Sequence, residues 1–569
     1  MTSNKVSLLD YGAGNVRSLR NAIKALGYEV EDISTADEIL NAGAILFPGV
    51  GRYGQAMKSI NQKGWFEALQ TYLKAGRPFF GICLGMQSLF EGSEEDPDVP
   101  GLGIIPGMVT RFLSTDTSVR VPQIGWNGLS LVKPSVMAEK LEEASKAYFV
   151  HSFCALPMAE NLDWVLSLTD YGEQRYISMV QKGNICACQF HPEKSGIVGL
   201  NILGSFLERA GLVSDGADAG ISTLGNPLEV ALAPFPKTQL VKRVIACLDV
   251  RSNDQGDLVV TKGDQYDVRE ASSSDGEKGG VRNLGKPVSL CERYYQEGAD
   301  EVVFLNITNF RQGVFEDAPM LKVLEKASEA VFVPLTVGGG IREYTDPDGK
   351  VWSALDVASR YFAAGADKVS IGSDAVAAAE EYLTSSKASG DSCLEQISQH
   401  YGAQAVVVSV DPKRVYVPSP ETPNAETPTP AGAVVMSLNE DKGDLMGPDG
   451  EAFCWWQVTV KGGRETRPLC AVTFSKVCER LGAGEIMLNC IDMDGQGRGY
   501  DLPLLHAVQK AVGVPVIVSS GAGKPEHFSQ AFESTGVMAA LAAGMFHRKE
   551  VTIEQVKAHL KEREIPVRL

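Results

Sequence analysis

The alternation of short apolar strands with amphipathic helices constrains the fold of this chain most strongly. Val6–Leu9 and Ala44–Phe47 have the length and apolar content of buried strands. The segment Asn15–Leu26, which Gly27 follows, has the pattern of a helix. Such alternation is typical of parallel strands joined by helical crossovers. We therefore expect the N-terminal part to form a mostly parallel sheet with flanking helices.

A second alternating region begins at Val241. Its strand candidates are Arg243–Leu248, Glu301–Leu305, Val331–Thr336, Lys368–Ile371, Ala405–Val410, Glu485–Leu488, Val514–Val518 and Met538–Leu541. Eight strands separated by helical segments are typical of a (β/α)8 TIM barrel.

A chain of 569 residues is too long for one hydrophobic core. We expect an α/β domain at 1–211, a linker at 212–240 that is rich in Gly, Ala, Pro and Ser, and the barrel at 241–569. Within the barrel, Glu270–Arg282, Tyr344–Lys350 and Val415–Gly450 have the composition of mobile surface loops.

The formal net charge of −18 argues against nucleic acid or an anionic membrane as a partner, since both attract basic surfaces. The eleven cysteines lack the spacing of a disulfide framework or a zinc site, and no other cofactor is indicated. There is no signal sequence and no apolar run of transmembrane length. We expect a cytoplasmic protein, or a plastid protein only if a transit peptide is missing from this sequence.

The barrel half of the sequence contains a repeat. Strands one and five end in Asp249 and Asp411, and Gly-rich turns follow strands three and seven and, more weakly, four and eight. The phosphate-cradle candidates are Gly339, Gly340, Gly372 and Ser373 in the first half, and Gly521, Gly523, Ala543 and Gly544 in the second. Backbone amides at the carboxyl ends of barrel strands bind phosphate, so two cradles indicate a substrate with two phosphates. Two carboxylates between them indicate acid–base chemistry, although turns and helix caps would also explain single copies of these features.

A further loop after strand six contains Asp492 and Gly495. Its acidic residues could hold a metal ion, but no downstream Glu completes a calcium-binding loop. We favour a phosphate- or substrate-binding loop.

The stretch Gly81–Gly85 has the pattern of a nucleophile elbow, with Cys83 between two glycines after an apolar strand. A nucleophilic cysteine needs a base and a group that orients the base. His191 and Glu193 supply both, because on an extended segment they would share one face. The Gly-rich turn at Gly49, Val50 and Gly51 is the best candidate for an oxyanion hole.

These motifs resemble the class I glutamine amidotransferases. The matching stretches are Gly81–Gln87, Phe149–Phe153 and Gln189–Glu193. The resemblance implies a glutaminase domain that releases ammonia, with a triad of Cys83, His191 and Glu193 and with Gln87 in glutamine binding. His151 falls in the family's His-Ser segment and is not the triad base.

The barrel resembles the cyclase of histidine biosynthesis at Arg243–Val250, Val337–Arg342, Gly365–Gly372, Asp492–Gly495 and Ser519–Phe528. Together the two resemblances point to the fused imidazole glycerol phosphate synthases of fungi and plants. They imply that phosphoribulosyl-formimino-aminoimidazole carboxamide ribonucleotide, a bisphosphate, is converted to imidazole glycerol phosphate and aminoimidazole carboxamide ribonucleotide. They also imply that Asp249 and Asp411 are the acid–base pair, without assigning which is the acid, and that Lys262 contacts substrate.

Strand parity adds a prediction about the barrel interior. If Asp249 points inward at the top of strand one, Arg243 points inward at the bottom. Lys368 has the same parity on strand four, and charges inside a barrel need partners, for which Glu301 and Glu485 are suitable. The resemblance places these four as a salt-bridged gate for ammonia; the alternative is four solvated charges at strand ends.

We therefore expect the glutaminase domain to dock on the bottom of the barrel through an intramolecular interface. Ligand in the barrel is expected to activate the triad, through a peptide flip near Gly49–Gly51. Two alternatives remain at this stage: a sugar-phosphate isomerase of the same pathway, and a metabolite sensor without catalysis.

Overall fold

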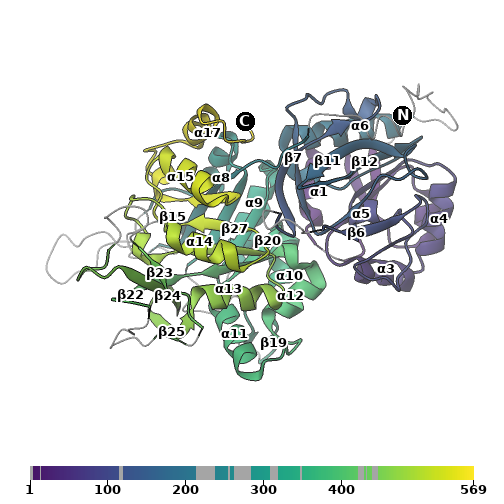
Figure 1. Ribbon diagram of the computed structural model, residues 1–569. Coiled ribbons are helices and arrows are strands. Elements are labelled where there is room, and N and C mark those ends of the chain that lie inside the picture. Colours follow the sequence, from purple (N-terminus) through teal and green to yellow (C-terminus); the bar gives the residue numbers. More distant parts are fainter. Residues whose placement is uncertain are drawn as a thin grey trace.

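A computed structural model describes residues 4–12, 14–113, 119–212, 237–253, 257–261, 283–307, 318–345, 349–420, 429–430, 432–438 and 446–569. The chain forms two bodies that lie side by side, the first drawn in purple to blue and the barrel in teal to yellow (Figure 1). Most of the predicted linker, 213–236, and all of the predicted insertion Glu270–Arg282 lie outside the described residues.

The first body is built on one sheet with strand order β2-β1-β3-β4-β13-β12-β11-β8. Its strands are β1 (Lys5–Leu8), β2 (Glu29–Asp32), β3 (Ile45–Gly49), β4 (Phe79–Cys83), β8 (Ser130–Leu131), β11 (Val165–Tyr171), β12 (Gln174–Lys182) and β13 (Ile185–Cys188). Pairs from β2 to β13 are parallel and the remaining pairs are antiparallel, which confirms the predicted mostly parallel sheet.

Helices cover this sheet, and the first of them confirms the helix predicted at Asn15–Leu26. They are α1 (Val16–Ala25), α2 (Ala36–Asn41), α3 (Tyr53–Gln62), α4 (Phe66–Lys74), α5 (Leu84–Gln87) and α6 (Gly196–Leu212). Asn15 caps α1 by accepting a hydrogen bond from the Ser18 amide. Two small sheets complete the body: β5 (Gly92–Ser93), β6 (Met108–Arg111) and β10 (Phe153–Ala155), and β7 (Gln123–Gly128) with β9 (Lys146–His151).

The second body is a closed parallel barrel, because its first and last strands pair with each other. The barrel strands are β14 (Arg243–Ser252), β16 (Glu301–Asn306), β17 (Leu335–Gly338), β20 (Lys368–Ile371), β21 (Val406–Val410), β26 (Glu485–Asn489), β27 (Val516–Ser519) and β28 (Ala539–Ala542). The predicted (β/α)8 fold is confirmed. The third strand begins four residues later than the predicted Val331; Pro334 has no N–H to donate, and pairing with β16 starts at Leu335.

The barrel helices are α8 (Pro287–Gln296), α9 (Ala318–Ala330), α10 (Ala354–Ala364), α11 (Ser373–Ser385), α12 (Cys393–Tyr401), α13 (Ala471–Arg480), α14 (Leu502–Ala511), α15 (Pro525–Thr535), α16 (Gly544–His547) and α17 (Ile553–Glu562). The short strand β15 (Leu258–Thr261) pairs with the end of β14. The second predicted insertion begins in β18 (Tyr344–Thr345), which pairs with β19 (Val351–Trp352) directly after its end.

The third predicted insertion, Val415–Gly450, was expected to be a surface loop, and this prediction is wrong for part of it. Its start belongs to β22 (Pro412–Val417), which pairs with β24 (Phe453–Val460); β23 (Met436–Ser437) and β25 (Glu465–Cys470) complete a four-stranded sheet. Val417 and Leu438 are buried against the barrel's core, so these parts of the segment are packed structure and not surface loop. This sheet lies at the end of the barrel away from the first body (Figure 1).

The two bodies share a tight interface at the bottom of the barrel. Lys194 Nζ lies 2.7 Å from Asp367 Oδ2, and Asn15 Nδ2 donates to Asp367 Oδ1 at 2.9 Å. Trp126 Nε1 donates to the carbonyl of Asp300 at 3.1 Å, and Trp126 packs in the same hydrophobic cluster as the barrel. The interface therefore combines apolar packing with buried polar contacts.

Candidate active sites

Cys83 ends β4 in a strained turn. Its φ of 53° is in the left-handed region, which a non-glycine residue rarely adopts outside a constrained turn. A Cβ at Gly81 would lie 2.6 Å from the Gly85 carbonyl oxygen, and one at Gly85 would lie 2.1 Å from the Phe47 carbonyl oxygen. Both glycines are thus required by close backbone approach, as in a nucleophile elbow.

His191 and Glu193 are in contact, but through a turn and not along an extended strand as predicted. His191 precedes the 3₁₀ turn Pro192–Lys194, and its Nδ1 lies 2.8 Å from Glu193 Oε1. Both side chains are buried. Burial disfavours the imidazolium, yet the Glu193 carboxylate and Cys83 together raise the pKa of His191 well above its ordinary value. The carboxylate therefore orients the ring and stabilises its protonated form.

A cavity of about 70 Å³ surrounds the thiol, and its wall includes Val50, Gly51, Gln87 and His191. Gly49 does not line it. The Gln87 side-chain amide donates to the Phe153 carbonyl and to Gln189 Oε1, both at 3.1 Å.

Tyr11 and Glu95 were missed by the sequence analysis. Tyr11 donates to the Val50 carbonyl at 2.6 Å and so holds the predicted oxyanion turn in one orientation. Glu95 lines the cavity and supplies a carboxylate, whose pKa burial raises. Neither residue stands in a local motif that could have pointed to it.

His151 lines the same cavity without belonging to the triad. Its Nδ1 lies 2.8 Å from the Phe153 carbonyl oxygen, so Nδ1 carries the proton. Nε2 is buried and has no hydrogen-bond partner among the described residues. Burial lowers the pKa of His151 to about 3, and the ring therefore stays neutral near neutral pH.

We expect His151 to make stability depend on pH. A histidine in the unfolded chain has a pKa of about 6.5. Below that pH His151 is therefore protonated in the unfolded chain but not in the folded protein. As the pH is lowered from about 6.5 to about 3, His151 should reduce the free energy of unfolding by about 1.4 kcal/mol per pH unit. His151→Asn retains an N–H for the Phe153 carbonyl and should remove this part of the slope. Denaturant titrations at several pH values measure it; equal slopes in both proteins would contradict the assignment.

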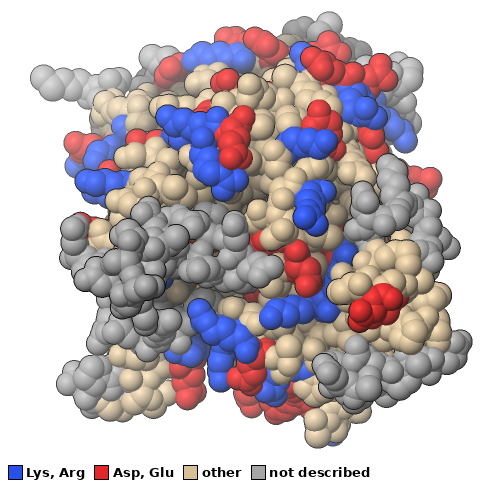
Figure 2. All heavy atoms as spheres, turned by 90° about the vertical axis from the view of Figure 1, so that its left-hand side faces the viewer, with Lys and Arg blue, Asp and Glu red and all other residues tan. Residues whose placement is uncertain are grey.

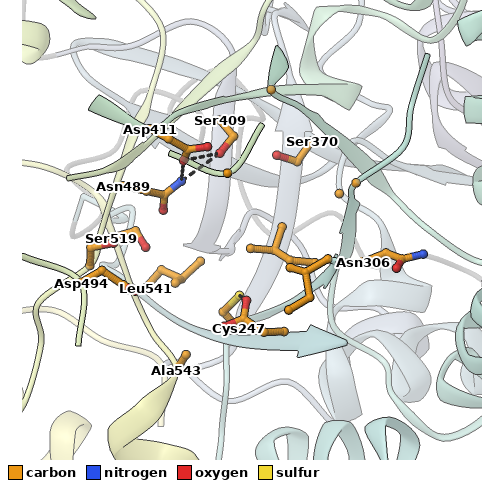
Figure 3. Close-up of a pocket in the computed structure, with 18 of the residues that line it drawn as sticks. Cys247, Asn306, Ser370, Ser409, Asp411, Asn489, Asp494, Ser519, Leu541 and Ala543 are labelled. Carbon is orange, nitrogen blue, oxygen red and sulfur yellow. Dashed lines mark hydrogen bonds between the residues drawn. The ribbon is translucent and has the colours of Figure 1, made fainter. Parts of the chain in front are cut away.

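The second cavity, of about 520 Å³, opens at the carboxyl ends of the barrel strands. Asp249, on the first barrel strand, and Asp411, directly after the fifth, both line it. Figure 3 shows Asp411 beside Ser409 and Asn489. Asn489 Nδ2 donates to Asp411 Oδ1 at 2.8 Å, and Ser409 Oγ donates to the same oxygen at 3.2 Å. These two donors orient one predicted acid–base group. The sequence analysis missed Ser409 and Asn489, although their strands were predicted correctly.

Most predicted phosphate-binding residues line this cavity. They are Gly339, Gly340, Gly372, Ser373, Gly495, Gly521, Ala543 and Gly544. Gly523 does not line it, and its amide donates to His527 Nδ1. Asp492 is exposed and accepts from the Arg414 amide at 2.8 Å, whereas the buried Asp494 lines the cavity in its place. Lys262 lies outside the described residues.

Figure 2 views the barrel from the end away from the first body. Over the described part of this face, Lys and Arg side chains alternate with Asp and Glu and do not form one continuous basic area (Figure 2).

The four predicted gate residues form a closed ring inside the bottom of the barrel. Arg243 Nη1 lies 2.7 Å from Glu301 Oε2, and Arg243 Nη2 contacts Glu485 Oε1. Lys368 Nζ lies 2.7 Å from a carboxylate oxygen of each of Glu301 and Glu485. The side chains are at most 1% exposed, so the alternative of solvated charges is wrong. Each charge has two opposite partners, as burial requires.

Removal of one cation should therefore destabilise the fold strongly. In Arg243→Met, Glu301 and Glu485 would share the single cation Lys368 in a dry environment. We expect a loss of about 3–5 kcal/mol in the free energy of unfolding, because an unpaired charge remains buried. Arg563→Ala, which breaks the half-exposed pair with Glu533, is the control and should change stability little. Similar, small effects of both variants in denaturant titrations would refute this view of the ring.

Each of the two bodies matches a known protein family. The family model described as glutamine amidotransferase class-I matches residues 7–207, and that described as histidine biosynthesis protein matches residues 243–552. Imidazole glycerol phosphate synthase hisHF, chloroplastic, of Arabidopsis thaliana is 53% identical over 564 residues, 99% of this chain and 89% of the relative. The hisHF of Schizosaccharomyces pombe is 50% identical, over 99% of each chain.

A relative that lacks the first body is also found. The imidazole glycerol phosphate synthase subunit HisF of Methanosarcina acetivorans is 36% identical over 330 residues, 58% of this chain and 100% of that subunit. In that archaeon the barrel half is therefore a separate chain.

The fold and the two sites define a glutamine amidotransferase joined to a cyclase-type (β/α)8 barrel. The chain belongs to the family of bifunctional imidazole glycerol phosphate synthases and is an enzyme of histidine biosynthesis. Neither the isomerase nor the sensor alternative accounts for this pairing.

None of the helices in the described residues is long and apolar enough to cross a membrane. In the same residues no group of three His, Cys, Asp or Glu side chains could hold a metal ion.

Proposed function

We propose that ammonia made at Cys83 passes through the barrel to Asp249 and Asp411. One observation carries this proposal: the cavity that contains Cys83 is also lined by Lys368, a member of the buried gate ring. The glutaminase site and the bottom of the barrel thus border the same cavity. An enclosed route keeps ammonia unprotonated and prevents its loss to water.

The first half of the reaction is glutamine hydrolysis. The Cys83 thiolate attacks the side-chain carbonyl carbon of glutamine, and His191 donates a proton to the departing nitrogen, so the C–N bond breaks and ammonia leaves. Water then cleaves the thioester and glutamate is released. Glu193 holds the imidazole, and amides of the Gly49–Gly51 turn stabilise the oxyanion. Gln87 helps to bind the substrate glutamine.

The second half takes place at the top of the barrel. The bisphosphorylated ribonucleotide spans the 520 Å³ cavity, with one phosphate at Gly339, Gly340, Gly372 and Ser373 and the other at Gly495, Gly521, Ala543 and Gly544. Asp249 and Asp411 lie between these cradles and exchange protons while the ammonia nitrogen is incorporated. Imidazole glycerol phosphate and aminoimidazole carboxamide ribonucleotide are the products.

We infer that the ring of Arg243, Glu301, Lys368 and Glu485 at the bottom of the barrel is the gate on this route. Its rearrangement would admit ammonia from below, and its position supports the role of a gate. Tyr11 holds the Val50 carbonyl in the resting state, so a peptide flip at this turn is the expected switch for glutaminase activation.

The decisive test is glutamine hydrolysis with and without the bisphosphate substrate. We expect ligand in the barrel to stimulate glutamate release by at least about fivefold, the lower end of usual allosteric coupling. Glutamate and imidazole glycerol phosphate should form in a ratio close to one. Unstimulated hydrolysis, or glutamate in large excess, would count against coupled sites.

We propose that the glutaminase domain spans residues 1–211 and the barrel residues 241–569. We also propose a cytoplasmic location. The Arabidopsis relative carries the description chloroplastic, so imaging of the tagged protein in cells of its source organism is the test of the compartment.

A further inference from the structure

The turn between β24 and β25 forms one wall of the barrel cavity. Lys461, Gly462 and Arg464 line the cavity beside the first cradle. Lys461, Gly462 and Gly463 have φ values of 56°, 65° and 78°, three consecutive residues in the left-handed region. Lys461 adopts this conformation without the freedom of glycine, so the surrounding contacts must hold it there.

Two contacts fix this turn to α11, the helix that follows the first cradle. The Lys461 amide donates to Ser373 Oγ at 3.2 Å. At the base of the hairpin, Arg467 donates to both carboxylate oxygens of Glu380, at 2.8 and 2.6 Å. Ser373 and Glu380 lie seven residues apart and share one side of the helix. The turn is therefore held over the start of α11.

The contact with Lys461 also orients the Ser373 hydroxyl. A hydroxyl has one hydrogen to donate. Since Ser373 Oγ accepts from the Lys461 amide, its own hydrogen is directed elsewhere. Ser373 lines the cavity, so an oxygen of a phosphate bound there would be a suitable acceptor.

A second hydroxyl in the cavity wall independently indicates a ligand. Ser370 precedes Gly372 on β20, is 3% exposed and lines the cavity. Its Oγ has no hydrogen-bond partner among the described residues. Figure 3 shows the Ser370 hydroxyl directed into the cavity. A buried donor of this kind calls for an acceptor that arrives with the ligand.

The charges around the first cradle favour an anion. Arg342, Lys461 and Arg464 line this part of the cavity, against one carboxylate, Asp374. Lys461 pairs with Glu465, but both side chains are largely exposed, so exchange for a phosphate partner costs little. Arg464 Nη1 donates to the Lys461 carbonyl at 3.1 Å, which keeps the guanidinium beside the turn.

The second cradle is surrounded by a different set of charged side chains. Among the described residues, the basic side chains that line the cavity away from the first cradle are Arg251, near the end of β14, and Arg548, which donates two hydrogen bonds to Glu550. The carboxylate of Asp494 lies on the same side. The two cradles, alike in backbone, thus differ in the side chains around them.

We propose that the turn Lys461–Arg464 is a clamp for one phosphate monoester of the substrate, at the cradle of Gly339, Gly340, Gly372 and Ser373. This inference rests on the proposed cyclase function and adds a binding element from the β22–β25 sheet to it. Lys461 and Arg464 supply positive charge and hydrogen-bond donors to the phosphate from the turn, and Ser373 donates to it from the start of α11. Charge-assisted hydrogen bonds of this kind are roughly twice as strong as neutral ones.

The test is the double variant Lys461→Ala/Arg464→Ala, assayed with ammonium salt in place of glutamine. The KM for the bisphosphate substrate should rise by about tenfold or more, with kcat changed less than about twofold, because ground state and transition state lose the same contact. The inhibition constant of inorganic phosphate should rise in parallel. Glutamine hydrolysis without ligand should be unchanged, which shows that the protein is folded.

The single variant Arg464→Lys separates charge from packing. It retains the positive charge and should keep KM within about threefold of the original enzyme. An unchanged KM in the double variant, a loss in Arg464→Lys as large as in Arg464→Ala, or an unchanged phosphate inhibition constant would each overturn the clamp. Failure of the unaltered enzyme to turn over with ammonium would instead refute the proposed cyclase function.

Discussion

Replacement of Cys83 by alanine is expected to abolish glutamine-dependent cyclisation and to leave ammonium-dependent cyclisation near its original rate. In the proposed mechanism the thiolate forms the covalent bond to glutamine, and among the described residues no other thiol lines the cavity. Loss of a nucleophile usually costs about 10³-fold or more. The cavity at the carboxyl ends of the barrel strands is separate from the glutaminase cavity and should accept ammonia from solution.

Glutamate release and imidazole glycerol phosphate formation should be measured in parallel, with glutamine or with ammonium salt. Cys186→Ala is the matched control, because Cys186 is a buried thiol on the neighbouring strand β13 and does not line the cavity. It should retain both activities. Loss of ammonium-dependent turnover in Cys83→Ala would contradict the division of labour between the two bodies.

Substitution of Asp249 or Asp411 by asparagine should stop cyclisation whichever nitrogen source is used. Asparagine retains the size of the side chain and, at Asp411, an oxygen that can accept from Asn489 and Ser409. It cannot exchange a proton as a carboxyl does. We expect a fall of about 10²–10⁴ in kcat, the usual contribution of a general acid or base.

Glutamine hydrolysis should survive in both variants, so the defect is located in the barrel. Asp391→Asn, at an exposed carboxylate before α12, is the control and should be fully active. Full activity of Asp249→Asn or Asp411→Asn would remove that residue from the mechanism. A defect that affects KM alone would indicate binding and not proton transfer.

Several parts of the active sites could be predicted because they depend on neighbouring residues. The elbow at Cys83 follows from two glycines that flank one cysteine, and the strained φ confirms it. The inward position of Arg243 follows from strand parity, since side chains two residues apart point to the same face. Most of the residues marked by the repeated Gly-rich turns line the barrel cavity.

Other parts were predicted incompletely because they depend on chain geometry between elements. His191 and Glu193 meet across a 3₁₀ turn that period-two reasoning did not foresee. Asp492 and Asp494 are two residues apart in a turn, and the fold places the second in the cavity. The segment from Val415 was expected to be a loop because of its composition, yet pairing with the distant β24 made part of it a strand.

By itself the sequence determined the fold class, the two-part organisation, the triad cysteine and the paired carboxylates of the barrel. Each of these is encoded in local periodicity, in a short motif or in the repetition of short motifs between the two halves of the barrel. Only the tertiary structure decided that the gate charges form one closed ring, that Cys83 and Lys368 share a cavity, and that a hairpin turn covers one cradle. These contacts join residues far apart in the chain, and their geometry is set by the closure of the barrel and by the packing of the two bodies against each other.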